Sequence, residues 1–332
     1  MSVPAELKTL VASKEYRAAL ALPDEVSEHY EPLAQGEYNK NYSFVHPVDG
    51  RKLVLRVNYG SQMHLEHQID YEANALKLLE PSGRTPKVWY VDGSLRYIAH
   101  GILVMDRLPG RPLDYGREED LETAARILAD IHRVPVPEDH GLLAPENALR
   151  AILEECEEMA AVYFESPLPP EEKKEKLREL LDLAWKKVDD LEGLPVRRCI
   201  INTEVNNTNF LVGEGAGWLI DWEKPLYGDP AQDLGHFLAP TTTFWKTDVI
   251  FTEEQINRFL DIYCAVAEDP TDVRARTKAA LPVICLRGLT WCAMAWVEYR
   301  RPERTLVNES TRRKLDQYLA DGFLQRIETI VK

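Results

Sequence analysis

Cysteine is scarce in this sequence, and its few copies are not arranged in pairs. The 332 residues include five cysteines, which is an odd number, and no two of them are spaced as CxxC. A disulfide framework and a zinc-binding cluster are therefore not predicted. We expect reduced thiols that are largely buried, because each cysteine lies in an apolar stretch.

The sequence also lacks a long apolar run free of charge. Its longest apolar stretch, residues 279–297, contains Pro282 and Arg287 and predicts a buried helix rather than a membrane span. The N-terminal residues, MSVPAELKTLVASKEY, carry acidic side chains and no sustained apolar core, which is not typical of a signal peptide. We therefore expect a cytoplasmic protein without a membrane partner.

Basic residues are too few to balance the acidic ones. The chain has 40 Lys and Arg against 55 Asp and Glu, for a net charge of −15. This balance argues against a nucleic-acid partner, whose phosphates require basic surfaces, and leaves room for a cationic ligand.

The apolar fraction of 45% is that of an ordinary globular protein, and the length suits two lobes. The oligomeric state stays open.

The order of the predicted elements indicates an α+β protein with two unequal lobes. A helical pattern over residues 1–30 is followed by an alternating pattern over residues 30–57, which predicts a β-hairpin with VDGR as its turn. An amphipathic helix ending at Pro81 and two further strands, KVWYVDG and YIAHGILVMDRL, come next. Helical patterns then dominate, over residues 118–134, 147–191 and 251–331. We predict a small β-rich lobe, residues 1–107, and a large helical lobe, residues 108–332.

One segment of the larger lobe combines the side chains that phosphoryl transfer needs. It reads CIINTEVNNTNFLVGEGAGWLIDW and contains Glu204, Asn209 and Asp221 between or at the ends of short strands. A hairpin would place Asn209 and Asp221 side by side, where their oxygens could share a hard cation such as Mg²⁺. Glu204 precedes Asn209 by the spacing that separates the base from the metal-binding Asn in kinases.

This region resembles the aminoglycoside phosphotransferase and choline kinase family, which has a protein-kinase-like fold. The family carries the motifs HGDxxxxN and IDWExxxxGDPxxDL, and LIDWEKPLYGDPAQDL matches the second almost letter for letter. The resemblance covers almost the whole chain and implies transfer of a nucleotide γ-phosphate to a hydroxyl of an aminoglycoside, an amino alcohol or a sugar-like compound. It implies that Asn209 and Asp221 bind Mg²⁺, and that Asp229 and Asp233 order the loop and begin the next helix.

The resemblance extends to the smaller lobe, where it implies a nucleotide site. LAQGEYNKNYSF resembles the family's nucleotide loop, with Gly36 and Asn39 near the phosphates. Arg56 stands where the family has a Lys or Arg that contacts phosphates, and Glu72 matches its ion-pair partner; taken alone, they fit a surface strand and a solvated helix face. ILVMDRLPGRPL resembles the hinge. Four residues would then flank the adenine of ATP through their backbone groups: Met105, Asp106, Arg107 and Leu108. GTP remains an alternative nucleotide, because the contacts run through backbone atoms.

The catalytic loop departs from the family at two positions. Asn202 and Glu204 stand where the family has His and Asp. Asn can supply hydrogen bonds in place of His, whereas the longer Glu moves its carboxylate by about 1.5 Å, which can cost on the order of a hundredfold in rate. Two hypotheses follow: an active kinase in which Glu204 orients or deprotonates the acceptor hydroxyl, and a nucleotide-binding pseudokinase with a regulatory or scaffolding role.

A C-terminal helix offers candidates for binding the acceptor. TWCAMAWVEYRRPER contains aromatic and acidic side chains that could form a wall for a cationic or polyhydroxylated compound. These side chains are Trp291, Trp296, Glu298 and Tyr299. Core packing of the two tryptophans is the alternative at this helical spacing. The family resemblance places acceptor contacts in this region but matches no single residue of it.

Overall fold

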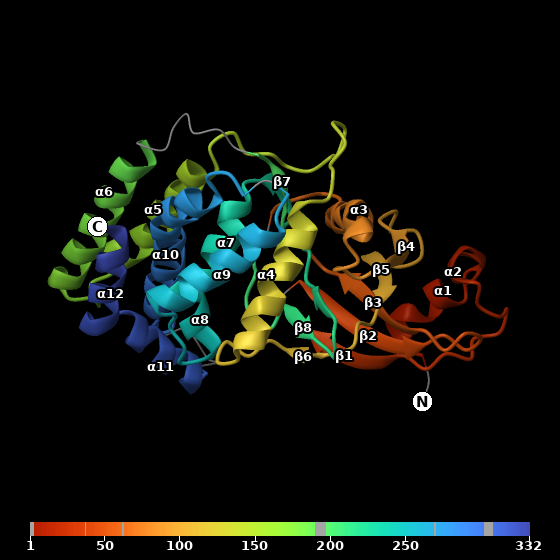
Figure 1. Cartoon of the computed structure of the whole chain (residues 1–332). Helices are drawn as coiled ribbons and strands as arrows, with labels where there is room; N and C mark the ends of the chain where they lie inside the picture. The colour runs from red at the N-terminus through yellow and green to blue at the C-terminus, as the bar shows by residue number, and fades with distance from the viewer. Residues whose placement is uncertain (1–2, 37, 62, 190–196, 269, 302–307) are drawn as a thin grey trace.

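The structure is a computed structural model that describes residues 3–36, 38–61, 63–189, 197–268, 270–301 and 308–332. It has a β-rich N-terminal part and a larger helical part, with the two chain termini at opposite ends (Figure 1). The predicted α+β class, with a β-rich N-terminal lobe, is confirmed.

Five antiparallel strands form the N-terminal sheet in the order β1-β2-β3-β5-β4. Their bounds are β1 Glu31–Gln35, β2 Asn39–Val45, β3 Lys52–Asn58, β4 Val88–Asp92 and β5 Gly101–Asp106. The predicted hairpin corresponds to β2 and β3, since Val45 pairs with Lys52 across the turn. Helix α3, Gln68–Leu79, and the short 3₁₀ helix η2, Glu80–Ser82, follow, and α3 packs against β4 and β5.

The N-terminal helices cover part of this sheet. They are η1 Ala5–Leu7, α1 Lys8–Val11 and α2 Lys14–Leu20. The helical prediction for this segment was too long, because Ala21 adopts a left-handed backbone with φ of 54° and Pro23 follows it. Leu10 and Tyr16 share one hydrophobic cluster with Phe44 and Leu55 of the sheet.

Nine helices are described in the remainder of the chain. They are α4 Glu118–His132, α5 Ala148–Glu165, α6 Glu171–Asp189, α7 Pro230–Leu238, α8 Pro240–Lys246, α9 Glu253–Val266, α10 Val273–Glu298, α11 Glu309–Tyr318 and α12 Asp321–Val331. Helix α10 packs against α5, α7, α8, α11 and α12. It is long and apolar enough to cross a membrane, but 67% of its most apolar window is buried in the protein, as predicted for a core helix. Four of the five cysteines are buried as well.

Short strands carry the loops at the junction of the two parts. They are β6 Arg111–Pro112, β7 Cys199–Ile201, β8 Phe210–Val212, β9 Gly217–Leu219 and β10 Leu226–Gly228. β6, β8 and β9 form one antiparallel sheet, and β7 pairs with β10. One hydrophobic core joins Val54 and Leu103 of the N-terminal sheet to Ile127 and Phe210 of the helical part. The loops therefore start from a rigid base between the two parts.

Candidate active site

Arg56 and Glu72 form the ion pair that the family resemblance implies, and the pair is buried. Arg56 lies in the middle of β3, and Glu72 lies on the face of α3 that covers the sheet. Nη1 of Arg56 donates to Oε1 of Glu72 over 2.6 Å, and Nε donates to Oδ1 of Asn41 over 3.2 Å. The two side chains are almost fully buried, with 8% and 1% of their surface exposed. A charged pair buried to this degree is held in one geometry.

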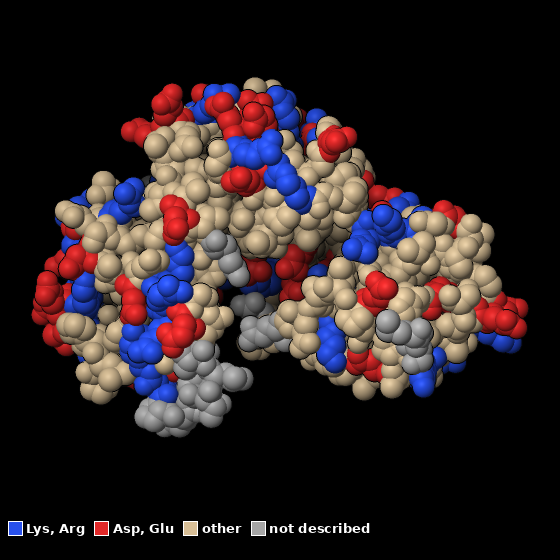
Figure 2. All heavy atoms as spheres, turned by 90° about the horizontal axis from the view of Figure 1, so that it is seen from below, with Lys and Arg blue, Asp and Glu red and all other residues tan. Residues whose placement is uncertain are grey.

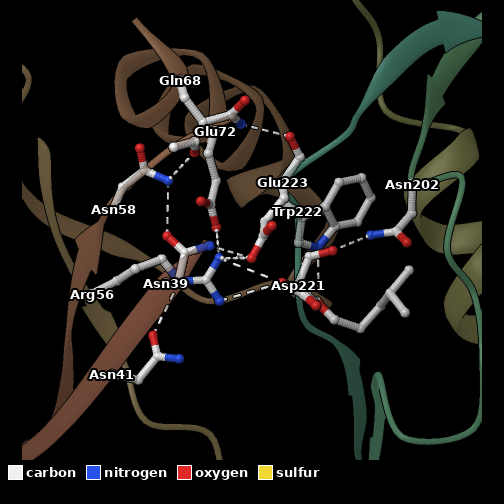
Figure 3. A network of polar contacts seen from close by, with 12 residues as sticks. Asn39, Asn41, Arg56, Asn58, Gln68, Glu72, Asn202, Asp221, Trp222 and Glu223 are labelled. Carbon is white, nitrogen blue, oxygen red and sulfur yellow. Dashed lines mark hydrogen bonds and ion pairs between the residues drawn. The ribbon is translucent and has the colours of Figure 1, made fainter. Parts of the chain in front are cut away.

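The same guanidinium reaches the loop that follows β9 (Figure 3). Its nitrogens lie 3.3 Å from Oδ1 of Asp221 and 3.5 Å from Oε1 of Glu223. The side-chain amide of Asn39, at the start of β2, also donates to Glu223. One cation thus joins carboxylates from both parts of the protein. The sequence indicated Arg56, Glu72 and Asp221 but not Glu223, although Glu223 belongs to the IDWE motif.

Negative charge exceeds positive charge in this cluster. Three carboxylates, those of Glu72, Asp221 and Glu223, surround the single guanidinium of Arg56. Burial opposes the charge of Arg56, but the carboxylates prevail and raise the pKa of its guanidinium. Burial raises the pKa of Glu223 to about 7, with Asp221 adding to the shift and Arg56 opposing it. Burial likewise raises the pKa of Glu72 against the effect of Arg56. A bound divalent cation would relieve this excess of negative charge.

Asn209 lies beside Asp221 at the end of the β8 and β9 hairpin, as predicted. The backbone N–H of Ile220 donates to the carbonyl of Asn209 over 2.8 Å, which extends the ladder of the two strands. The side-chain Nδ2 of Asn209 donates to the carbonyl of Glu204 over 2.9 Å. The Oδ1 of Asn209 therefore points away from that carbonyl. One Asp and one Asn fit Mg²⁺, which keeps several waters and phosphate oxygens among its ligands. Among the described residues no group of three His, Cys, Asp or Glu side chains could hold a metal.

The backbone at two residues of these loops is strained. Asp221 has φ of 65° and Thr203 has φ of 71°, both in the left-handed region that favours glycine. Such a conformation costs on the order of 1–3 kcal/mol and persists where surrounding bonds enforce it. The carbonyl of Asp221 accepts a bond of 2.9 Å from Nδ2 of Asn202. Asn202, which the sequence resemblance aligns with the His of the motif HGDxxxxN, thereby ties the two loops together.

Asp233 orders the loop that carries Glu204. It is fully buried on α7 and accepts hydrogen bonds from the backbone N–H groups of Asn202 and Thr203, each over 2.8 Å. It also accepts from Nε2 of His132 over 3.2 Å, and the other ring nitrogen of His132 contacts the hydroxyl of Tyr263. His132 is thus a packed helix residue. Asp229 caps α7 by accepting from Ala231, whereas Asp233 lies inside the helix and acts on the loop.

Glu204 forms an ion pair with Lys224, which the sequence did not indicate. The ammonium of Lys224 meets Oε1 of Glu204. The Glu204 side chain is 38% exposed, and that of Lys224 is 10% exposed. Lys224 comes three residues after Asp221, inside the matched LIDWEKPLYGDP segment, so its position in the motif was the available signal. Both residues border open space between these loops and the neighbouring helices.

That space is a cavity of 340 Å³ on the helical side of the site, which we call the acceptor cavity. It is lined by Glu155, Met159, Glu204, Asn206, Thr208, Lys224, His236, Thr241, Thr242, Trp245, Ile284, Arg287, Gly288, Trp291 and Cys292. These residues come from α5, α7, α8, α10 and the loops beside Glu204. From below, the protein surface is hollowed between its helical and β-rich parts, and acidic and basic side chains meet at the inner wall of the hollow (Figure 2).

The structure does not bring together the four residues predicted to bind the acceptor. Trp291 lines the acceptor cavity, whereas Trp296, Glu298 and Tyr299 lie outside its lining. Trp296 packs against Tyr163 of α5, and its Nε1 donates to Asp316 of α11. Five residues along a helix correspond to a rotation of about 140°, so Trp291 and Trp296 point to different sides of α10. Core packing, the alternative considered for the tryptophans, applies to Trp296.

The predicted nucleotide loop is the turn between β1 and β2. The N–H of Gly36 donates to the carbonyl of Asn39 over 2.8 Å and closes the turn, whose residue 37 lies outside the described residues. Oδ1 of Asn39 accepts from Asn58 over 2.9 Å while its amide reaches Glu223. The Asn39 side chain therefore links β2 and β3 to the Asp221 loop, and phosphate contacts of this turn would come from its backbone.

The predicted hinge follows β5. Met105 is buried in the sheet opposite Val54. The N–H groups of Asp106 and Arg107 donate to the carbonyls of Lys87 and Lys52 over 3.0 and 2.9 Å. The N–H groups of Asp106 and Arg107 are therefore already bonded within the protein. In the predicted hinge, the N–H of Leu108 would be the donor to the adenine ring.

Comparisons with known proteins bear on the family and the fold. A sequence profile described as the phosphotransferase enzyme family matches residues 29–279. No curated protein matches the sequence. The solved structure of a spectinomycin phosphotransferase, in complex with ADP and spectinomycin, is similar over 100% of this chain and 99% of its own, with 13% identity and a TM-score of 0.66.

Two further structures are similar over nearly their whole length. A choline/ethanolamine kinase family protein from Mesorhizobium loti has 19% identity and a TM-score of 0.61, with 96% of this chain and 94% of its own covered. An ethanolamine kinase from Plasmodium vivax has 13% identity and a TM-score of 0.64, with 99% and 92% covered. At these identities the similarity shows the fold, and it confirms the predicted protein-kinase-like architecture. Because the profile covers most of the sequence, the chain belongs to the phosphotransferase enzyme family.

Proposed function

We propose that the chain transfers the γ-phosphate of ATP to a hydroxyl group of a small molecule in a Mg²⁺-dependent reaction in the cytoplasm. Family membership supports the reaction class, and the ADP bound in the related spectinomycin phosphotransferase supports a nucleotide donor. The observation that carries the proposal is the convergence on Arg56, whose guanidinium contacts both Glu72 in the β-rich part and Asp221 beside Asn209. Glu204 and Lys224, from the neighbouring stretches of these loops, line the acceptor cavity.

Each residue has a proposed role. Asn209 and Asp221 would hold Mg²⁺, which when bound neutralises negative charge on the phosphate oxygens. Arg56, fixed by Glu72, would bind the nucleotide phosphates, and the turn at Gly36 and Asn39 would cover them. The adenine would lie against the segment from Met105 through Asp106 and Arg107 to Leu108, at the boundary between lobes 1–107 and 108–332. GTP would fit the same backbone groups.

The transfer itself would occur where the nucleotide site meets the acceptor cavity. The hydroxyl oxygen of the acceptor forms a bond to the γ-phosphorus, and the bond from that phosphorus to the bridging oxygen of ADP breaks. Glu204, whose carboxylate lines the acceptor cavity, takes the hydroxyl proton. Most of the rate enhancement would come from positioning and from neutralising phosphate charge, because little covalent chemistry falls to the protein.

A nucleotide-binding pseudokinase is the second candidate, and one observation favours it. Lys224 already pairs with Glu204, and an ammonium held at that carboxylate opposes uptake of a proton by it. In this case the chain would bind nucleotide and regulate a partner without transferring phosphate.

Product formation distinguishes the two candidates. The full chain is incubated with ATP, Mg²⁺ and a panel of aminoglycosides, amino alcohols and sugars, and phosphorylated products are detected by mass spectrometry. We expect Asp221→Ala and Glu204→Gln to lower turnover about a hundredfold or more. Glu118→Gln is the control, since it removes an exposed carboxylate of α4 that pairs with Arg258 of α9. Nucleotide binding without any product, together with product after Glu204→Asp, would exclude the active enzyme.

A further inference from the structure

Positive and negative charges are balanced among the residues that line the acceptor cavity. The lining contains two carboxylates, Glu155 and Glu204, and two cations, Lys224 and Arg287. Glu204 is paired with Lys224. Arg287 is paired with Glu155 through two bonds, from Nε over 2.8 Å and from Nη2 over 3.3 Å. A cationic acceptor would therefore find no lining carboxylate without a partner and would approach two positive side chains.

His236 adds a polar group without adding charge. Burial, aided by the neighbouring Arg287, lowers the pKa of its imidazole to about 4. Its Nδ1 is buried and makes no hydrogen bond within the part of the chain that the structure describes. His236 belongs to the lining of the acceptor cavity, together with Arg287 and Glu204. Its neutral ring therefore adds polar surface to the cavity without adding a charge.

An aromatic wall forms another side of the cavity. Trp245 of α8 and Trp291 of α10 meet edge to face, with ring centroids 5.2 Å apart. Trp291 is 42% exposed, which is unusual for a side chain of this size. An exposed indole beside paired charged groups offers an apolar surface for the C–H face of a ring and hydrogen bonds for the groups at its edge.

We propose that the acceptor is an uncharged polyhydroxylated ring of sugar-like size. Its apolar face would pack on Trp291, and its hydroxyls would bind the Arg287–Glu155 pair beside the neutral ring of His236, with one hydroxyl directed at Glu204. The cavity of 340 Å³ is large enough for such a ring, since small-molecule pockets span roughly 300–1,000 Å³. The inference rests on the proposed function, because the position of Glu204 in the same cavity identifies it as the acceptor side.

Matched compounds that differ in charge test the inference. Glucose and myo-inositol are the neutral rings, glucosamine the cationic ring, glucuronate the anionic ring and choline the acyclic cation. Binding to the full chain is measured without nucleotide, by saturation-transfer NMR and by quenching of tryptophan fluorescence. Transfer from ATP with Mg²⁺ is measured separately, by mass spectrometry. We expect a neutral ring to be favoured over glucosamine and over choline by about tenfold or more in both measurements.

Two variants locate the effect in the cavity. Arg287→Glu replaces the balanced lining by one with two excess negative charges, so we expect the preference to move toward glucosamine by about tenfold. Trp291→Ala should weaken binding of the neutral ring about tenfold without changing the affinity for ADP. Arg258→Glu, which changes an exposed arginine of α9 that pairs with Glu118 and Glu122, is the matched control.

The outcomes separate this inference from the proposed function. The protein could bind a neutral ring, with weaker binding in Trp291→Ala, and yet transfer no phosphate to it from ATP. This outcome would support the inference about the class of bound compound and reject the proposed phosphotransferase activity. Transfer that favours glucosamine or choline supports the phosphotransferase and overturns the acceptor class. The inference is rejected if neither glucose nor myo-inositol binds at millimolar concentration. It is also rejected if Arg287→Glu and Arg258→Glu change the preference between the neutral ring and glucosamine equally.

Discussion

Glu204 and Lys224 lie 20 residues apart in the sequence and form an ion pair on the wall of the acceptor cavity. The pair bears directly on the departure that the sequence resemblance indicates in the catalytic loop. By that resemblance, Glu204 carries one more methylene than the Asp of the motif HGDxxxxN, and a longer side chain has more rotamers to restrict. An ammonium from the neighbouring loop can restrict them and hold the carboxylate toward the acceptor.

Lys224→Met tests this role. Without the ammonium, the Glu204 carboxylate loses its partner and its fixed orientation, so we expect kcat to fall about tenfold or more while the KM for ATP changes little. Lys224→Arg keeps the charge and should retain more of the activity. Steady-state kinetics with the best acceptor from the panel give both constants. A rise in kcat for Lys224→Met would instead show that the ion pair restrains Glu204.

The buried pair of Arg56 and Glu72 makes a prediction about stability. Arg56→Met leaves Glu72 as a buried carboxylate without its cation, and we expect the free energy of unfolding to fall by about 3–5 kcal/mol. The double variant Arg56→Met with Glu72→Leu removes both charges and should recover part of the loss. Denaturant titration followed by circular dichroism measures the difference.

A surface pair provides the comparison. Arg96 and Glu15 lie 3.5 Å apart, and both side chains are more than half exposed. Arg96→Met should leave the unfolding free energy nearly unchanged, because exposed ion pairs are screened by water and salt. Equal losses for Arg56→Met and Arg96→Met would contradict the structural role of the buried pair.

The cluster around Arg56 was indicated by the family resemblance rather than by local patterns. Arg56, Glu72, Asn209 and Asp221 lie in short segments with a fixed order, and that order identified them. Taken alone, Arg56 and Glu72 fitted a surface strand and a solvated helix face, whereas the structure buries both side chains. The acceptor side was not predictable, because its lining is assembled from α5, α7, α8 and α10. No local pattern indicates which faces of four helices meet around one space.

Long-range partners account for the remaining differences. Lys224 meets Glu204 because β7 and β10 pair and bring the two loops together, and this pairing leaves no signal in either segment alone. Asp233 was expected to order the loop and begin a helix, but its carboxylate lies inside α7 and binds amides about thirty residues earlier in the chain. A one-dimensional pattern identifies which side chains are suited to a role and not which backbone groups they reach.

The excess of carboxylates around Arg56 predicts a metal-dependent stabilisation. ADP with Mg²⁺ should raise the melting temperature of the protein more than ADP alone, because the cation neutralises charge on both the carboxylates and the phosphates. At a hundredfold excess over the dissociation constant, a ligand stabilises the folded state by about 2.7 kcal/mol. Asp221→Asn should abolish the part that depends on Mg²⁺, as measured by differential scanning calorimetry.

The control for this measurement is Glu118→Gln, whose carboxylate lies on α4 outside both sites. It should retain the full shift with Mg²⁺. A shift of the same size in Asp221→Asn would show that Mg²⁺ acts without Asp221 and would remove this residue from the proposed metal site.

His236 predicts a dependence of stability on pH. Burial, aided by Arg287, lowers the pKa of its imidazole from 6.5 to about 4 in the folded protein. Between these values the unfolded chain binds a proton that the folded protein does not bind, so the free energy of unfolding falls as the pH decreases from 6.5 toward 4. We expect this group to account for about 2 kcal/mol, less than the full shift allows because the side chain is only partly buried.

His236→Gln isolates this contribution from that of the carboxylates, which also destabilise the protein in acid. The difference in unfolding free energy between pH 7 and pH 4.5 should be smaller in this variant than in the wild type, because Gln carries no titrating group and the unfolded chain gains no proton there. His67→Gln changes an exposed imidazole at the start of α3 and should keep the wild-type difference. If His236→Gln also keeps it, the imidazole is not held neutral by its surroundings, and the cavity loses the uncharged polar group on which a neutral acceptor would depend.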